Sequence, residues 1–246
     1  MRRLLLALDA LNCEAARIEA AAALASALGA ELEALFVEDD DLYTAAALPI
    51  TQEISSGSAR ERELSSAGLE SALRAISREA ESRVRSALAR GQLRGGFRVT
   101  RGRRSEALGE ASEGTDVLLL PAARTVVRLR VRTQTAAKIV AICGPGPAGA
   151  RTIALATRLA KSTHQALELV CAGEPGSAAG HIPERSGLHA VRHDFAAATP
   201  LAQLLDAVDK RSGNTLLVAT DIPAATDRAA LLEQLAALRC EVLLVN

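Results

Sequence analysis

The stretch that decides the fold is Arg3-Leu-Leu-Leu-Ala-Leu-Asp9, an apolar run of strand length that ends on a carboxylate. A helix-length segment rich in Ala and Leu follows at residues 14–28. Gly29 can close it, and a second apolar run occupies residues 32–37. Short continuous apolar runs are typical of strands buried on both faces, as in parallel sheets. The order strand, helix, strand therefore predicts a βαβ unit with a right-handed crossover.

The same unit occurs a second time. When Arg3 is aligned with Lys138, Asp9 falls on Gly144 without a gap, and matches continue through the helix and the second strand. Solenoid repeats have periods of about 20–50 residues, so a repeat of this length indicates a duplicated domain. The sequence thus predicts two tandem α/β domains.

Each predicted domain lacks an element that the other keeps. In the first, residues 69–88 carry apolar residues at helical spacing and predict a long helix. In the second, a stretch rich in Gly and Pro follows Cys171 and predicts a loop in that place. We expect one domain at residues 1–134 and the other, with the loop, at residues 135–246.

Composition narrows the classes of function. The chain is 49% hydrophobic, but no run approaches the roughly 18 apolar residues of a membrane helix. The first apolar run stops at Asp9 without a signal-cleavage pattern, so we expect a cytoplasmic protein with no membrane partner. The net charge is zero, and aromatic residues make up only 2% of the chain, with no Trp. Base stacking on aromatic side chains is therefore not expected, which argues against a nucleic-acid partner.

Arginines are nevertheless concentrated between Arg83 and Arg132. Near the end of this span Arg128, Arg130 and Arg132 alternate with apolar residues, which predicts an edge or interface strand with one basic face. Such a face can bind phosphate backbones, and we keep nucleic-acid binding as a third hypothesis. The sequence leaves the role of residues 124–132 open.

No group of residues predicts a metal or catalytic site. Consecutive carboxylates at residues 38–41 favour a helix N-terminus or a solvated loop over a metal site. His189 and His193, with Asp194 beside them, could bind a metal, but exposed polar residues at a strand end are the favoured interpretation. The four cysteines form no CxxC pair, and three of them end predicted strands, which is typical of buried apolar thiols. They are Cys13, Cys143, Cys171 and Cys240.

Several strand patterns resemble the universal stress protein family, here as a tandem of two diverged domains. The patterns are Leu5-Leu-Ala-Leu-Asp9, Leu35-Phe-Val-Glu38, Val117-Leu-Leu-Leu120 and Val242-Leu-Leu-Val245. The resemblance implies two tandem open parallel sheets in the order 3-2-1-4-5, of the adenine nucleotide alpha hydrolase-like type, each partly degenerate. It also places ligands at the carboxyl ends of strands 1 and 4.

The family's ATP-binding members carry a Gly-x2-Gly-x9-Gly-Ser/Thr run after the fourth strand, and this chain departs from it. Pro121-Ala-Ala-Arg124 follows that strand, with no Gly before Gly144. The second domain has no Gly after Gly213. The loop from Gly144 to Gly149 lacks the Lys-Ser/Thr of a P-loop, so a strand-to-helix turn is expected there. Neither half has the glycine-rich motif that would cradle phosphates.

Two functions are therefore the main hypotheses. The first is a non-catalytic stress-response or regulatory protein, without a cofactor, that acts through contacts with an unknown protein partner. The alternative is a sensor of adenine nucleotides or other small ligands in the first domain. By the resemblance, Asp9 and Val37 occupy positions that contact a nucleotide, and Arg124 could add phosphate charge. Asp9 is equally typical of a helix cap.

Assembly is the last expectation. The closing strand at residues 241–245 has an apolar edge, which invites pairing. The equivalent segment at residues 126–131 carries arginines that would repel a second copy. We therefore expect these two strands to pair within one chain. A homodimer would then use another surface, such as residues 42–54.

Overall fold

The structure is a computed structural model that describes residues 2–48, 51–54, 61–63, 65–122, 138–144, 146–172, 190–196, 199–209, 215–220 and 228–246. Its contacts divide the chain into two compact units. The first contains Leu5–Glu113, and the second contains Gly114–Asn246 together with Arg2–Leu4. Both are α/β with mostly parallel strands, as predicted. The expected boundary between residues 134 and 135 lies outside the described residues.

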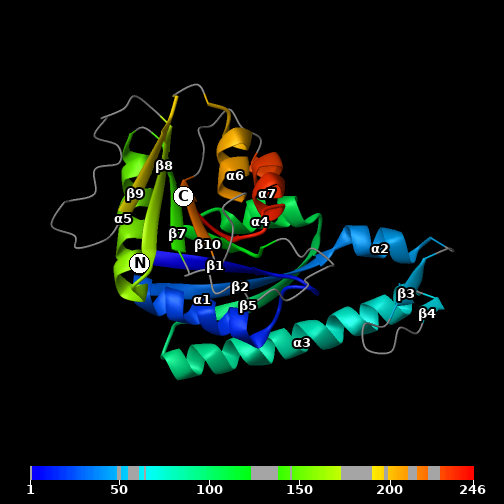
Figure 1. The fold of residues 1–246 in the computed structure, drawn as a ribbon. Coiled ribbons are helices and arrows are strands. Elements are labelled where there is room, and N and C mark those ends of the chain that lie inside the picture. Colours follow the sequence, from blue (N-terminus) through cyan, green and yellow to red (C-terminus); the bar gives the residue numbers. More distant parts are fainter. Residues whose placement is uncertain are drawn as a thin grey trace. The chain divides into compact units, whose positions relative to one another are not determined.

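In the described part of the first unit, three strands share one sheet in the order β5-β2-β1 (Figure 1), which is the order 3-2-1 of the predicted sheet. The short strands β3 and β4 form a separate antiparallel pair. The strands β2 and β5 are parallel, with Val37 opposite Thr100. Helices α1 and α3 lie on one side of these strands and α4 lies on the other. The elements are β1 (Arg2–Leu8), α1 (Ala15–Leu28), β2 (Ala30–Asp39), α2 (Asp40–Ala46), β3 (Gln52–Ile54), β4 (Glu61–Glu63), α3 (Ser66–Gly91), β5 (Gly95–Gly102) and α4 (Arg104–Ser112).

Local sequence explains the two long helices of this unit. In α1 the small residues Ala21 and Ala25 are fully buried, which allows close packing against α3. Gly29 ends α1 in the left-handed conformation (φ 60°), where a residue with Cβ is disfavoured. The side chain of Ser65 caps α3 by accepting a hydrogen bond from Gly68 N at 3.1 Å. The predicted helix at residues 69–88 is confirmed and is somewhat longer.

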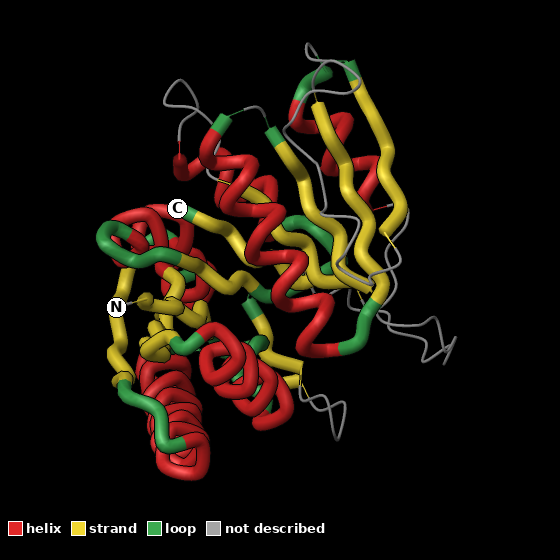
Figure 2. The backbone as a smooth tube through the Cα atoms, turned by 90° about the vertical axis from the view of Figure 1, so that its left-hand side faces the viewer, coloured by secondary structure: helices red, strands yellow, loops and turns green. Residues whose placement is uncertain are grey.

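The second unit contains six strands in the order β6-β11-β10-β7-β8-β9. Numbered by their place in the second repeat, the strands from β11 to β9 have the order 5-4-1-2-3. Counted from the other edge this order is 3-2-1-4-5, which confirms the expected sheet. Helix α5 lies on one side of these strands, and α6 and α7 lie on the other (Figure 2). The elements are β6 (Val117–Leu120), β7 (Lys138–Cys143), α5 (Pro147–Thr163), β8 (Ala166–Ala172), β9 (Ala190–Phe195), α6 (Leu201–Asp209), β10 (Thr215–Thr220), α7 (Arg228–Ala236) and β11 (Glu241–Val245).

The prediction that the closing strand pairs with residues 126–131 is wrong. On one side β11 is parallel to β10, and on the other it is antiparallel to β6, with Leu243 opposite Leu119. Both sides of β11 are therefore occupied, and its residues Val242, Leu243 and Leu244 are fully buried. The closing strand does pair with the first repeat inside one chain, but through that repeat's fourth strand. Residues 126–131 lie outside the described part.

One further difference concerns the second unit. Helix α6 was not predicted, although Leu204, Leu205 and Val208 are its buried residues and lie at helical spacing. The stretch after Cys171 that was expected to form a loop continues, beyond Ala172, into residues 173–189, which are not described.

Candidate functional site

The candidate site lies at the carboxyl ends of β1, β2 and β5 in the first unit, where open α/β sheets bind ligands. A charged residue that takes part in an ion pair follows each of these strands. Asp9 follows β1, Asp40 follows β2, and Arg104 comes two residues after β5. The site therefore lies at the strand ends that carry Asp9 and Val37, two of the candidate residues named from the sequence.

Asp9 is fully engaged. Its Oδ2 lies 2.9 Å from Nη1 of Arg104, and its Oδ1 accepts hydrogen bonds from the backbone N of Leu11 at 2.8 Å and from Nδ2 of Asn12 at 2.9 Å. The side chain of Asp9 is 14% exposed and that of Arg104 is 28% exposed. Charge-assisted hydrogen bonds of this kind are stronger than neutral ones, particularly when partly buried. They hold the β1–α1 loop in a fixed conformation.

The alternative role predicted for Asp9, as a helix cap, is only partly right. Helix α1 begins at Ala15, and its N-cap residue is Glu14, whose side chain makes no capping hydrogen bond. Asp9 instead caps the turn that precedes the helix, by accepting from the backbone two residues further on. The sequence could not distinguish these roles, because both favour Asp after a strand.

A second group of contacts covers the carboxyl end of β2. Tyr43 donates its hydroxyl hydrogen bond to Oε2 of Glu38 at 3.0 Å. The guanidinium of Arg101 lies over the Tyr43 ring, 3.6 Å from its centroid, and its Nε donates to Oδ1 of Asp40 at 2.9 Å. This cation–π and ion-pair arrangement joins α2 to the end of β5. Tyr43 was not singled out from the sequence, although it is the chain's one tyrosine.

The pKa shifts in this group favour the forms already present at neutral pH. Burial, followed by the hydrogen bond to Glu38, raises the pKa of Tyr43 above its ordinary value of 10.0. The hydrogen bond to Asp40 raises the pKa of Arg101 above its ordinary value. Tyr43 therefore stays a neutral donor and Arg101 stays a cation. Neither shift moves a group towards the neutral range in which general acids and bases work.

The other nucleotide candidates are less informative. Val37 is buried within β2, and its neighbour in β5 is Thr100. Arg124 lies outside the described residues, so the structure brings only Asp9 and Val37 to the same edge.

The acidic run at residues 38–41 forms a helix N-terminus, which was one of its two predicted interpretations. Asp39 is the N-cap of α2, and its Oδ1 accepts from Asp41 N at 3.1 Å. Glu38 and Asp40 are bound to Tyr43 and Arg101 as described above. Among the described residues, no group of three His, Cys, Asp or Glu side chains could hold a metal ion.

At the same end of the second unit, Gly144 replaces Asp9 and leads into helix α5. A Cβ on Gly149, in the first turn of this helix, would lie 1.9 Å from the carbonyl oxygen of Gly144. The loop is therefore folded closely against the helix and depends on the absence of a side chain at Gly149. Three of the cysteines also belong to this unit, and Cys143, Cys171 and Cys240 are all buried, as predicted.

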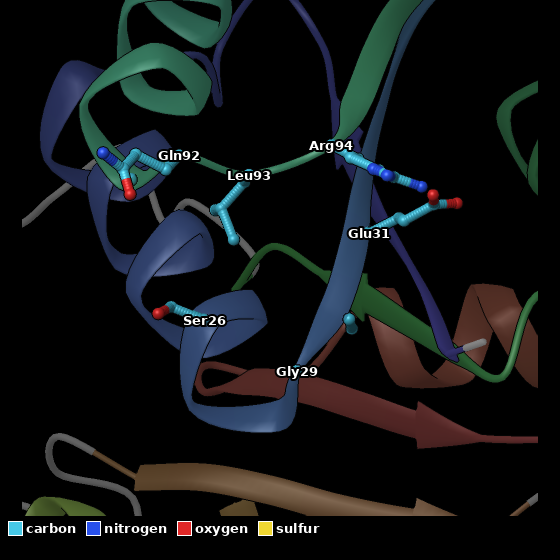
Figure 3. Close-up of a pocket in the computed structure, with 8 residues that line it drawn as sticks. Ser26, Gly29, Glu31, Gln92, Leu93 and Arg94 are labelled. Atoms are coloured by element: carbon cyan, nitrogen blue, oxygen red, sulfur yellow. The ribbon is translucent and has the colours of Figure 1, made fainter.

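A hollow of the first unit lies away from this edge. It has a volume of about 320 Å³ and lies at the opposite ends of β2 and β5, between the C-termini of α1 and α3 (Figure 3). Its lining includes Ser26, Gly29, Glu31, Gln92 and Arg94, which are labelled in the figure. The charged residues of this lining are one acid, Glu31, and one base, Arg94. We therefore do not place the functional site there.

Several arginines of the arginine-rich span form ion pairs. On α3, Arg83 pairs with Glu79 at 2.5 Å and Arg85 pairs with Glu81 at 2.6 Å, both one helical turn apart. Arg90 of α3 pairs with Glu19 of α1. These acids offset part of the positive charge that a phosphate backbone would bind, and nucleic-acid binding stays a prediction.

Membrane insertion was not expected from the sequence. Within the described residues, none of the helices has the length and apolar character needed to cross a bilayer.

The fold and the site define an α/β protein of the open parallel-sheet class with the strand order 3-2-1-4-5. A universal stress protein from Archaeoglobus fulgidus DSM 4304, of known crystal structure, is similar to the chain with a TM-score of 0.54. The two share 12% sequence identity over 98% of this chain and 96% of that chain. At this identity the likeness concerns the fold alone. No family model and no curated protein matches the sequence.

Proposed function

We propose that this chain is a non-catalytic stress-response or regulatory protein that acts through contacts with a protein partner and does not bind ATP. The sequence resemblance and the shared fold support the stress-response class. The ion pair between Asp9 and Arg104 supports the absence of ATP binding, and this observation carries the proposal. The carboxylate that would face a nucleotide is already bound by a guanidinium and two N–H donors.

Releasing Asp9 for a ligand would be costly. A ligand would have to replace the contact between Asp9 and Arg104. Leaving the partly buried guanidinium without its carboxylate costs about 1–3 kcal/mol of stability. The neighbouring Tyr43, Arg101 and Asp40 are likewise satisfied by one another. A site whose charged groups are paired internally resists a new ligand, and it gives catalysis no free acid or base.

The protein contact we propose uses the exposed apolar residues around α2. Leu42 is 39% exposed and Leu48 is 53% exposed. Both lie within the segment at residues 42–54, which was named from the sequence as one surface that a homodimer could use, and exposed apolar side chains favour association. A second copy of the chain is the partner we test first.

The alternative, a nucleotide or small-ligand sensor, is favoured by one observation. Nη2 of Arg104 is buried and has no hydrogen-bond partner among the described residues. An anionic ligand group could satisfy this donor without disturbing the Nη1 contact to Asp9.

Thermal unfolding of the full chain with and without ATP, ADP, AMP or inorganic phosphate separates these functions. We expect no change in Tm at millimolar ligand, since a ligand that binds only the folded state would raise it. A rise that is lost in Arg104→Gln but kept in Arg98→Gln would instead establish the sensor.

Light scattering of Leu48→Ser, with Val191→Ser as the control, tests the contact surface. If the wild type is a dimer and only Leu48→Ser becomes a monomer, the contact is supported. If the wild type is itself a monomer, self-association is contradicted.

A further inference from the structure

Two cysteines of the second unit lie directly opposite each other. In the parallel pair of β7 and β8, Cys143 is the register partner of Cys171. Cys143 ends β7 and Cys171 is the last but one residue of β8, and they are 1% and 4% exposed respectively. Because residues paired in register point to the same face of a sheet, their side chains share one face. The alignment of β7 with β8 brings together two thiols that are far apart in the sequence.

The spacing of the pair suits a disulfide. Neighbouring strands lie about 4.7–4.9 Å apart. A disulfide needs a Cα separation of roughly 4.4–6.8 Å and Cβ atoms on the same side. Both thiols are free in the structure. The register of β7 with β8 therefore meets the Cα requirement of a disulfide without a shift of either strand.

The next strand supplies charge beside the pair. On β9, Asp194 is the register partner of Cys171, and Nε of Arg192 donates to Oδ1 of Asp194 at 2.7 Å. The neighbouring thiol of Cys143 lowers the pKa of Cys171, and the charge of Arg192 lowers it further, against the opposing effects of burial and Asp194. The pKa of Cys143 is raised, first by its interaction with the thiol of Cys171 and then by burial. Cys171 is thus the thiol that more readily becomes the reactive thiolate.

We propose that Cys143 and Cys171 form a reversible redox site that a small hydroperoxide oxidises to an intramolecular disulfide. This function goes beyond the proposed partner binding and does not depend on it. Hydrogen peroxide is the oxidant we name, because it is close to water in size and can reach a pair that is only slightly exposed. Larger oxidants would need the strand ends to open.

The reaction balances in two steps. The thiolate of Cys171 attacks one oxygen of the peroxide, so an S–O bond forms, the O–O bond breaks, and the departing hydroxide takes a proton to become water. The thiol of Cys143 then loses its proton and attacks the sulfur of the sulfenic acid on Cys171. The S–S bond forms, the S–O bond breaks, and a second water leaves. Two thiols lose two electrons, and one peroxide becomes two waters.

The other two cysteines provide internal controls. Burial raises the pKa of Cys240 to about 11, so this thiol should remain reduced. Cys13 is only partly buried and lies in the first unit, in the β1–α1 loop. It tests whether simple exposure, rather than the pair, determines which thiol reacts with peroxide.

Peptide mapping of the native protein after peroxide treatment tests the proposal directly. Trypsin leaves each cysteine on a separate peptide, with Cys143 within residues 139–151 and Cys171 within residues 162–185. We expect these two peptides to be joined, with a mass lower by two hydrogens, and to separate after reduction. The same treatment in denaturant should lose this selectivity, because the register that pairs the thiols is then gone.

Variants identify the order of the reaction. Cys143→Ser should stop the reaction at a sulfenic acid on Cys171 that a sulfenate-specific reagent traps. Cys171→Ser should abolish both products, whereas Cys13→Ser should leave the crosslink unchanged. A native protein that retains four thiols at peroxide levels that oxidise free cysteine would overturn the proposal. So would a crosslink that involves Cys13 or Cys240 in place of the pair, or one that joins two chains.

Discussion

Oδ2 of Asp9 and Nη1 of Arg104 lie 2.9 Å apart, which joins the loop after β1 to the first residue of α4. The contact links residues far apart in the sequence and spans the carboxyl edge of the first unit. Because both side chains are mostly buried, the pair stabilises the edge more than a surface ion pair would.

We expect Asp9→Ala to lower the free energy of unfolding by about 1–3 kcal/mol, since it leaves Arg104 and the Leu11 N–H without their acceptor. The matched control is Glu110→Ala, an exposed acid on the same helix as Arg104, which should change stability by less than about 0.5 kcal/mol. Urea denaturation of the three proteins measures both effects. Equal effects in the two variants would contradict a stabilising ion pair. A more stable Asp9→Ala would show that Asp9 is kept at a cost to stability.

Tyr43 gives a direct optical readout of the second group of contacts, because the chain has one tyrosine and no tryptophan. Its pKa in the folded protein should lie above the ordinary value of 10.0, which the unfolded chain in urea should show. The raised pKa contributes stability that is present below about pH 10 and is lost as the pH rises through the folded-state pKa. Tyrosinate absorbance followed against pH measures both states.

Two variants should move this pKa in opposite directions. Glu38→Gln removes an acceptor and a negative charge that raise the pKa of Tyr43, so the pKa should fall. Arg101→Gln removes a positive charge that lowers it, so the pKa should rise. Shifts of the same sign in both variants would contradict the arrangement of Glu38, Tyr43 and Arg101.

Leu243 tests the central position of β11. It is fully buried and paired with Leu119 across the antiparallel contact, so Leu243→Ala should cost about 2–5 kcal/mol in the unfolding of the second unit. Val191→Ala, on the exposed side of β9, serves as the control in the same unit. Deleting residues 241–246 should abolish the cooperative transition of that unit. A truncated chain that stays folded and only changes its oligomeric state by light scattering would make this prediction wrong.

Gly95 tests the start of β5. Its φ is +155°, and an added Cβ would lie 1.8 Å from the carbonyl oxygen of Leu32, so Gly95→Ala should destabilise the first unit by more than about 1 kcal/mol. Gly109 lies within α4 and has open space around it. Gly109→Ala should therefore stabilise the protein by about 0.4–1 kcal/mol. Thermal unfolding should give Tm changes of opposite sign, and a stabilised Gly95→Ala would contradict the close approach to Leu32.

The sequence by itself determined the elements whose pattern is local. The apolar runs at β1, β2, β7 and β11 are strands, and the helical spacing at residues 69–88 forms most of α3. The resemblance supplied the strand order, which the second unit confirms. Even the burial of Cys143, Cys171 and Cys240 followed from their places at strand ends. Periodicity and strand length are properties of neighbouring residues, so they can be recognised without a partner.

Only the tertiary structure decided which distant residues meet. Asp9 was expected either to contact a nucleotide or to cap a helix, yet it pairs with Arg104. The closing strand was expected to pair with residues 126–131, yet β6 occupies that side of β11. Cys143 and Cys171 become neighbours only through the register of β7 with β8. A one-residue shift in register would turn the side chains of one strand to the other face. Crossovers and strand register set these pairings, and neither is encoded in the local pattern of any one segment.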